Sequence, residues 1–365
     1  MRFLSISVTD LRCFTNIEYL PGERNNLICG ENGSGKTTLL EAFAISSVGR
    51  SFLTNRTNEL VKSGAVGFSV SAEAVFRSGS AFLDGVTTIF VRRTHAESVI
   101  TINGKAVASA STLARSAPLL TINSKAPDLL SESPSNRRAL VDRTLFHVKQ
   151  DYVAVWKGYR HALQQRNEIL RRCTPSQVHY WNEKLAAYGE MIDEQRRRVV
   201  AAINDNLASL NQGPFPFSFD YHSGYQGQGN LLRELQDSWG RDVALGHTIA
   251  GPHRADLALR QSGKTIAKRL SRGQSKYIAC AAIVGLARFI KAQVGTPPVL
   301  LIDDLAAELD DKVRGRTIEM LGSLDAQCIY TAIRPSDLPE LMSNEINVFH
   351  VEHQAPKSKV IRSSD

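Results

Sequence analysis

GENGSGKT, residues 30–37 of this 365-residue chain, decides the fold class. It fits G-x-x-x-x-G-K-[ST] at every fixed position and lies between a short apolar run at residues 26–29 and a helix-like stretch at residues 38–46. Glycines let a backbone wrap a polyphosphate closely with its N–H groups pointing inward, and the following helix N-terminus adds positive potential. The sequence therefore predicts a P-loop between a strand and a helix.

Two side chains of this loop have distinct chemical tasks. Lys36 is expected to reach the β- and γ-phosphates of ATP and to act in catalysis, and Thr37 to ligate Mg²⁺. The correct flanks argue against the alternative, a chance glycine-rich turn. The predicted nucleotide contacts of the loop are Gly30, Glu31, Asn32, Gly33, Ser34, Gly35, Lys36, Thr37 and Thr38.

LSRGQ, residues 270–274, precedes a helix of small residues and resembles the L-S-G-G-Q signature of ABC ATPases. Ser271 and the Gly273 N–H are expected to cap that helix and form a second anion site, with Gln274 as a further nucleotide contact. A plain polar turn is the alternative. Because the P-loop already serves its own subunit, we expect this turn to close on the nucleotide of an opposing subunit, so that ATP holds a dimer together.

VLLIDD, residues 299–304, is an apolar run that ends in two carboxylates and fits a Walker B strand. Asp303 is expected to hold Mg²⁺ with Thr37, and Asp304 occupies the place of the glutamate that polarises the attacking water in ABC ATPases. The shorter Asp304 side chain predicts slow turnover. Two aspartates that only cap the next helix are the alternative.

Three further features have two interpretations each. Residues 307–310 resemble the D-loop that touches the partner subunit in ABC dimers, and they also suit a plain helix start. Thr331 stands where transporters have a switch histidine, which leaves its role open. Arg12 matches a nucleotide-contacting position of SMC-like ATPases, and an exposed arginine in a turn fits equally well.

The remaining patterns predict an α/β ABC-type P-loop ATPase head with an antiparallel β region and an inserted helical subdomain. Short β-prone stretches between residues 68 and 103 indicate the antiparallel sheet. Apolar residues spaced three or four apart indicate a helical hairpin, with one helix at residues 152–171 and the next with Thr174 as its N-cap and Pro175 at its first position. The expected divisions are an N-terminal ATPase part at 1–122, a mainly helical insertion at 123–245 and a C-terminal ATPase part at 246–365.

Composition limits the class of protein and of partner. Hydrophobic residues make up 42% and charged residues 22%, as in ordinary soluble proteins, and a net charge of +8 favours polyanions. The five cysteines stand singly, which suits a reducing compartment. The first residues alternate like a strand, unlike a signal peptide, and we find no run of 18 apolar residues, so we expect a cytoplasmic protein with no membrane contact.

The order and spacing of these motifs resemble the RecF family. Two further strings support the resemblance: GPHRADL at residues 251–257 is similar to the family's G-P-H-R-x-D-L block, and SPSNRR at residues 133–138, followed by LVD, to its S-P-x-x-R-R run. The chain departs from the family at residues 124–126, where Pro-Glu-Asp is expected near the Q-loop. Asn123 is the nearest candidate for the Q-loop residue.

The resemblance implies a weak, DNA-dependent ATPase that uses ATP and Mg²⁺ and dimerises with ATP. It implies DNA binding near junctions of single and double strands and at gaps, and cooperation with RecR and RecO in loading RecA during DNA repair, replication and the SOS response. Basic residues of the helical subdomain are candidate DNA contacts, although a solvated helix face is the alternative. These candidates are Arg137, Arg138, Arg196, Arg197 and Arg198.

Three other functions compete with this hypothesis. Thr331 and the 251–257 block argue against an ABC transporter subunit. Lys36 and Ser271 are 235 positions apart, too few for the long coiled-coil arm of an SMC protein. A nucleotide-sensing module with little or no hydrolysis stays open because of Asp304.

Overall fold

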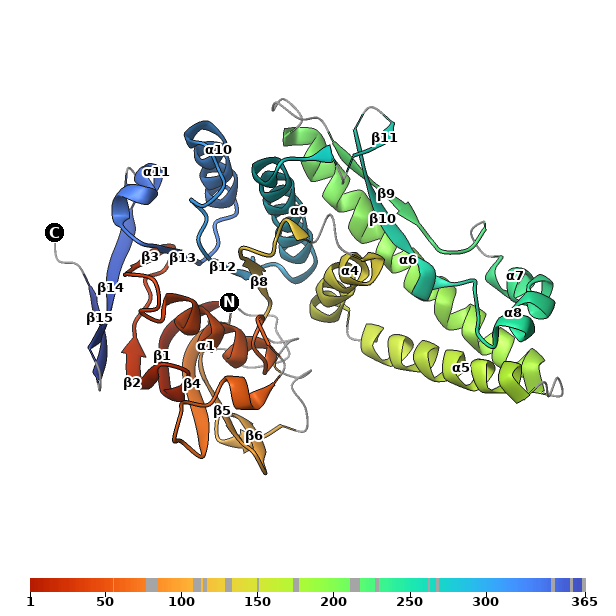
Figure 1. Ribbon diagram of the computed structural model, residues 1–365, viewed down its shortest axis with the longest axis horizontal. Coiled ribbons are helices and arrows are strands. Elements are labelled where there is room, and N and C mark those ends of the chain that lie inside the picture. Colours follow the sequence, from red (N-terminus) through yellow and green to blue (C-terminus); the bar gives the residue numbers. More distant parts are fainter. Residues whose placement is uncertain are drawn as a thin grey trace. The chain divides into compact units, whose positions relative to one another are not determined.

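The computed structural model divides the chain into two compact units, Met1–Pro127 with Ser271–Asp365, and Asp128–Leu270. Figure 1 shows the elements of each unit along the colour gradient of the sequence. The structure describes residues 1–54, 56–76, 85–107, 113, 117–128, 133–149, 151–172, 177–210, 217–226, 230–261, 263–266, 269–342, 345–354 and 357–362.

An antiparallel sheet of the order β2-β1-β4-β5-β6-β7 forms one layer of the first unit. Its strands are β1 (Arg2–Leu11), β2 (Phe14–Tyr19), β4 (Gly67–Phe76), β5 (Gly85–Thr94), β6 (Ser98–Ile102) and β7 (Lys105–Ala106). The β6–β7 turn consists of Asn103 and Gly104, whose φ angles of 48° and 75° are the positive values that a tight hairpin requires. The predicted antiparallel region is therefore present.

A second sheet, of the order β15-β14-β3-β13-β12-β8, carries the nucleotide motifs. Its strands are β3 (Asn25–Cys29), β8 (Leu119–Ile122), β12 (Val299–Ile302), β13 (Cys328–Ala332), β14 (Ile346–Gln354) and β15 (Lys357–Arg362). All pairings are parallel except β14 with β15. Strands β12 and β13 are buried at every position, which explains their unbroken apolar sequences.

Helix α1 (Lys36–Val48) packs against β1, β4 and β5 of the antiparallel sheet and against β8 and β13 of the parallel sheet. Leu39 and Phe43 are fully buried in the shared core, together with Val299 and Leu301 of β12. The hydrophobic contact of this one helix with both sheets holds the P-loop against the strand ends.

Helix α9 (Arg272–Val294) packs against β8 and α10 (Asp311–Gly322). Among the described residues it is the one helix long and apolar enough to cross a membrane, and 72% of its most apolar window is buried inside the protein. This burial is that of a core helix of a globular protein. The unit also contains the short helices η1 (Thr57–Glu59), η5 (Pro335–Asp337) and α11 (Pro339–Met342).

The second unit is mainly helical. Its helices are α4 (Pro134–Val148), α5 (Tyr152–Arg172), α6 (Val178–Leu210), α7 (Leu231–Asp237), α8 (Trp239–Leu245) and η3 (Pro252–Arg254). A small sheet of the order β11-β10-β9 joins β9 (Ser218–His222), β10 (Asp256–Gln261) and β11 (Lys264–Thr265). The predicted helical hairpin corresponds to α5 and α6, whereas Thr174 and Pro175 lie outside the described residues.

The boundaries of the units differ from those expected at residues 122/123 and 245/246. Residues 246–270, which we assigned to the C-terminal ATPase part, belong to the helical unit. The reason is strand pairing: β10 lies antiparallel to β9, with Leu257 opposite Tyr221. The alternating strand and helix pattern of the sequence could not show which sheet β10 joins.

Candidate nucleotide-binding site

The P-loop follows β3 and ends where α1 begins at Lys36. Gly33 and Gly35 have φ angles of 83° and 105°, in the left-handed region that glycine adopts without strain. A Cβ at Gly35 would lie only 2.4 Å from the Phe14 ring, so glycine is required there for space as well. The loop is thus bent tightly against the antiparallel sheet, with the N-terminus of α1 at its end.

Lys36 folds back over this loop. Its Nζ donates to the carbonyl oxygens of Gly30 and Glu31 at 2.6 and 2.9 Å. Burial lowers the pKa of Lys36, while Asp303 and Asp304 act in the opposite direction. An ammonium held by backbone carbonyls alone is poised to exchange them for phosphate oxygens, which carry more negative charge.

Thr37 and Asp303 lie side by side although they come from opposite ends of the sequence. Thr37 Oγ1 donates to the Asp303 carboxylate, 3.2 Å from Oδ1 and 3.1 Å from Oδ2. The Asp303 N–H donates to the Ile122 carbonyl at 2.7 Å, which fixes the end of β12 against β8. A hydroxyl and a carboxylate oxygen at this spacing are hard ligands that suit Mg²⁺ with phosphate and water.

Thr331 holds both aspartates of the Walker B pair, a role that we left open from the sequence. Its hydroxyl donates to Asp303 Oδ1 at 2.7 Å and accepts from the Asp304 N–H at 3.0 Å. The signal that could have found it is a lone threonine in the apolar strand β13, which neighbours β12. Thr331 therefore orients the Asp303 carboxylate and the Asp304 backbone.

Asp304 stands just beyond the end of β12 and is exposed, with a φ of 52°. This left-handed conformation is uncommon for a residue with a Cβ and is often found at functional positions. The adjacent Asp303 has its carboxylate engaged by Thr37 and Thr331, so the two carboxylates have different surroundings. That division suits one metal ligand and one group free to polarise water.

The signature turn forms the cap of α9. Ser271 Oγ accepts from the Gln274 N–H at 3.1 Å, and the Ser271 N–H donates to Gln274 Oε1 at 2.9 Å, a reciprocal capping box. The side-chain oxygen of Gln274 is used within the cap, and the predicted contact of Gln274 with a nucleotide stays a prediction. Ser271 itself is exposed at the helix N-terminus, where an anion is stabilised.

Arg12 is paired with a buried carboxylate that the sequence interpretation missed. Its guanidinium contacts Glu41, which lies in the middle of α1 and is 0% exposed. Ser51 also donates to Glu41. The detectable signal was a single glutamate within the apolar stretch of α1. Arg12 thus fixes the turn after β1 against the helix of the P-loop.

Comparisons with known proteins show the family of this chain. The family model described as the RecF/RecN/SMC N terminal domain matches residues 3–357. The DNA replication and repair protein RecF of Shewanella loihica is 32% identical over 358 residues, covering 96% of this chain and 98% of that protein. The same-named protein of Teredinibacter turnerae is 34% identical over 366 residues, covering 95% and 94%. The chain belongs to the RecF family.

Solved structures confirm the expected fold class. The recombination mediator protein RecF, solved with ATP, has a TM-score of 0.84 at 24% identity and covers all of this chain and 98% of its own. An Smc head bound to the C-winged helix domain of ScpA has a TM-score of 0.61 at 15% identity. This RecF-family chain therefore has the ATPase head fold that RecF and Smc proteins share.

The two strings that carried the RecF resemblance meet within the helical unit. Arg137 of the first string donates to the carboxylate of Asp256 in the second, from Nε to Oδ1 at 2.8 Å and from Nη2 to Oδ2 at 2.9 Å. Arg138 donates to the Ala255 carbonyl at 2.6 Å. These bonds attach the N-terminal turns of α4 to the start of β10. They give Arg137 and Arg138 structural roles, and the assignment of these two arginines as DNA contacts stays a prediction.

The assignment of Arg196 as a DNA contact requires correction. It is 3% exposed, and its guanidinium holds both oxygens of Asp142, at 2.8 and 2.9 Å, and the Pro252 carbonyl at 2.7 Å. Burial disfavours the charge, yet Asp142 raises the pKa of Arg196 overall. A guanidinium satisfied in this way inside the protein cannot reach a DNA phosphate.

Arg197 and Arg198 lie nearer the surface of α6. Arg197 Nε donates to Asp193 at 2.9 Å, and its guanidinium stacks over the Tyr221 ring at 5.2 Å. Arg198 pairs with Glu194 on the exposed face of the helix, the i, i+4 arrangement that we named as the alternative. Of the five candidate arginines, Arg198 is the most exposed, with 58% of its side chain accessible to solvent.

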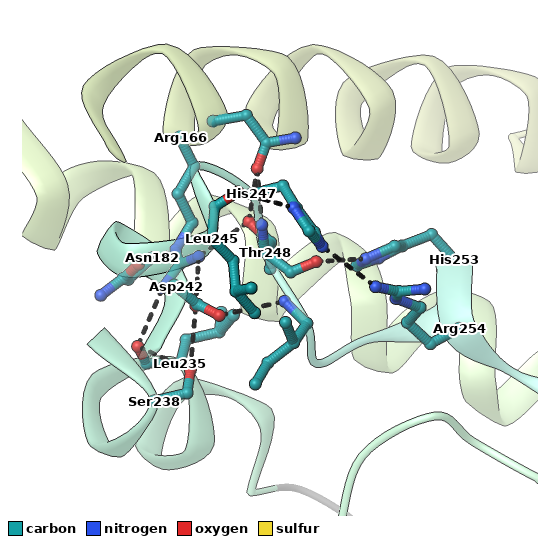
Figure 2. Close-up of polar contacts among 12 residues, drawn as sticks. Arg166, Asn182, Leu235, Ser238, Asp242, Leu245, His247, Thr248, His253 and Arg254 are labelled. Carbon is teal, nitrogen blue, oxygen red and sulfur yellow. Dashed lines mark hydrogen bonds and ion pairs between the residues drawn. The ribbon is translucent and has the colours of Figure 1, made fainter. Parts of the chain in front are cut away.

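The GPHR turn at residues 251–254 rests on a buried polar network (Figure 2). Arg166 and Asp242 are both fully buried and form an ion pair at 2.7 Å. Arg166 also donates to Asn182 of α6 and to Thr248, each at 2.7 Å. This one guanidinium therefore connects α5, α6, α8 and the segment before the turn.

His253 has a structural role, because both of its ring nitrogens form hydrogen bonds within the helical unit. Its Nε2 lies 3.1 Å from the Thr248 carbonyl, which only accepts, so Nδ1 accepts from the Tyr159 hydroxyl at 2.6 Å. Burial is the main cause that lowers the pKa of His253 to about 4. The ring is neutral at physiological pH, and among the described residues no cluster of potential metal ligands occurs.

Proposed function

We propose that this RecF-family chain is an ATP-binding and ATP-hydrolysing protein of DNA replication and repair. The observation that carries the proposal is the contact of Thr37 with Asp303, because it joins the P-loop to the Walker B strand across 266 positions. Two relatives more than 30% identical along nearly the whole chain bear the name DNA replication and repair protein RecF. The ATPase head fold of the family and the contact between the P-loop and the Walker B strand support ATP as the substrate.

The residues of the site divide the chemistry of hydrolysis among them. The P-loop N–H groups and Lys36 bind and orient the β- and γ-phosphates, replacing the carbonyl partners that Lys36 now has. Thr37 and Asp303 would hold Mg²⁺, which neutralises charge on the phosphates when bound. Asp304 orients a water molecule for attack and accepts its proton. We propose slow turnover because the Asp304 side chain is shorter than that of the glutamate found at this position in ABC ATPases.

The proposed active form is an ATP-dependent dimer. Ser271 and the Gly273 N–H lie at an exposed helix N-terminus, where they would stabilise the γ-phosphate of ATP held by the opposing P-loop. Gln274 supports this turn through the cap. Loss of the γ-phosphate on hydrolysis removes these contacts, so ADP would release the dimer.

DNA is the proposed polyanionic partner, with junctions of single and double strands and gaps as the preferred structures. The net charge of +8 supports a polyanion, and Arg198 remains a candidate contact, with Arg197 beside it. RecR, RecO and RecA are the proposed protein partners. The solved RecF proteins similar to this chain are described as recombination mediators of the RecFOR pathway. A cytoplasmic location fits this role and the burial of α9.

DNA binding measured with ATP, with ADP and without nucleotide tests the proposal, with dimer formation followed by sedimentation. We expect a dimer and tight binding to gapped DNA only with ATP. Absence of DNA binding in all three states would contradict the proposal and indicate another function within the ATPase superfamily.

A nucleotide-sensing module that binds ATP and hydrolyses little of it is the second candidate. The aspartate at position 304 favours it, because its carboxylate reaches less far than that of a glutamate. Phosphate release by the wild type and by Asp304→Asn separates the two candidates. An ATPase loses its rate on this substitution, whereas a sensor shows the same background rate in both proteins.

A further inference from the structure

Lys276 is a buried cation in the first turns of α9. It is 1% exposed, and its Nζ donates to the backbone carbonyls of Asp304 and Ala307 at 2.7 and 2.6 Å. An ammonium group strongly prefers water, so its burial is unfavourable unless hydrogen bonds replace that water. Here the replacement comes from the segment that follows the Walker B strand.

This segment, residues 304–308, contains two unfavourable backbone conformations. Asp304 and Glu308 are both non-glycine residues with positive φ angles, 52° and 74°. Such conformations are intrinsically unfavourable and persist only where surrounding contacts fix them. Asp304 is fixed on both sides, because Thr331 accepts from its N–H and Lys276 donates to its carbonyl.

Two further contacts join the start of α9 to the same segment. A Cβ at Gly273 would lie 2.6 Å from the Glu308 carbonyl oxygen, so the two backbones approach more closely than any side chain would allow. Arg272 Nε lies 2.7 Å from Glu308 Oε1. The signature turn and the segment carrying Asp304 are therefore packed together through three residues of α9.

We propose that Lys276 is a positioning residue that fixes the Asp304 backbone, so that the Asp304 carboxylate stays aligned to orient the water that attacks the nucleotide of the same subunit. The inference rests on the proposed ATPase function. Lys276 touches neither phosphate nor metal in this role. Because it lies on the helix that begins at Ser271, it also links the orientation of Asp304 to the signature turn.

The test compares steady-state ATP hydrolysis by the wild type and by Lys276→Met, which keeps the length of the side chain and removes the ammonium group. We expect kcat to fall about 10- to 100-fold, since small displacements of a reacting group have effects of this size. The KM for ATP should stay near the wild-type value, because Lys36 and Thr37 are intact. Lys276→Arg, which retains the charge and the donors, should recover part of the rate.

Lys291→Met is the matched control. Lys291 lies on the same helix and its Nζ also donates to a backbone carbonyl, that of Leu324, at 3.2 Å. We expect this variant to keep the wild-type kcat. Thermal unfolding of each variant gives the folded fraction by which its rate is corrected.

A corrected kcat of Lys276→Met equal to that of the wild type would overturn the inference, since the lysine would then serve stability alone. If Lys276→Met does not fold, Lys276→Leu replaces it as a second side chain without a donor, and a wild-type kcat in that variant overturns the inference in the same way. Failure of the proposed function looks different, because the wild type and Lys291→Met would then hydrolyse no ATP.

Discussion

Thr37 Oγ1 lies 3.1 Å from Asp303 Oδ2, although 266 positions separate the two residues. The contact is possible because β3 and β12 both neighbour β13 in the parallel sheet, so their carboxyl ends point to the same edge. The long helical insertion and the antiparallel sheet intervene in sequence without separating the two motifs in space.

Asp303→Asn should lower kcat for ATP hydrolysis by about 100-fold, because a neutral amide holds Mg²⁺ poorly and the metal contributes several kcal/mol to phosphoryl transfer. The Mg²⁺ concentration for half-maximal rate should rise. Phosphate release measured across a Mg²⁺ titration checks both effects. Asp311→Asn, at an exposed aspartate of α10, is the control and should behave as the wild type. Normal hydrolysis by Asp303→Asn would show that the Walker B assignment is wrong.

Ser271→Arg should leave ATP binding by the monomer nearly intact while it prevents the ATP-driven dimer and most hydrolysis, because bulk then fills the place of a phosphate oxygen. Lys36→Ala should lose productive ATP binding. A mixture of the two variants forms one complete site, from the P-loop of the first and the signature turn of the second. Partial recovery of hydrolysis on mixing is the expected result. An ATP-independent monomer with full activity would exclude a shared site.

Arg198→Ala should remove about one contact with a DNA phosphate. The slope of log K against log salt concentration should therefore become less steep by about 0.9. Fluorescence anisotropy across a salt series measures this slope. Arg233→Ala is the matched control, because Arg233 is also an exposed arginine in an i, i+4 ion pair, on α7 of the same unit. An unchanged slope for Arg198→Ala would place the DNA surface elsewhere.

Arg166→Met should lower the free energy of unfolding by about 3–5 kcal/mol, because it leaves the buried Asp242 carboxylate without its cation. Urea denaturation of the wild type and the variant measures the difference. Arg233→Met, at an exposed pair, should change stability by no more than about 0.5 kcal/mol. Equal stability of Arg166→Met and the wild type would contradict the structural role of this pair in the helical unit.

The burial of His253 should make stability depend on pH. Its pKa is lowered from 6.5 to about 4, so between these values the unfolded chain binds a proton that the folded chain does not. Stability is therefore lost as the pH falls from 6.5 towards 4, by up to about 3 kcal/mol. His253→Gln, which cannot titrate, should lose less stability than the wild type between pH 7 and pH 5 in urea denaturation. Equal losses would contradict the assignment.

The sequence by itself determined the local nucleotide motifs and the elements that carry them. A P-loop needs glycines at fixed spacing, and a buried strand needs an unbroken apolar run, so residues 30–37 and 299–304 predicted their own local structure. The helix cap at Ser271 and the helical hairpin followed from equally local rules of spacing.

Only the tertiary structure decided which distant residues meet. The sequence predicted that the arginines of α4 and α6 contact DNA. Arg196 is nevertheless buried, because the fold brings the carboxylate of Asp142 to its guanidinium. Thr331, Glu41 and Lys276 acquired their roles in the same way, through neighbours far away in the chain. The charge of a side chain is a local property, whereas its burial and its partners depend on the packing of the whole unit.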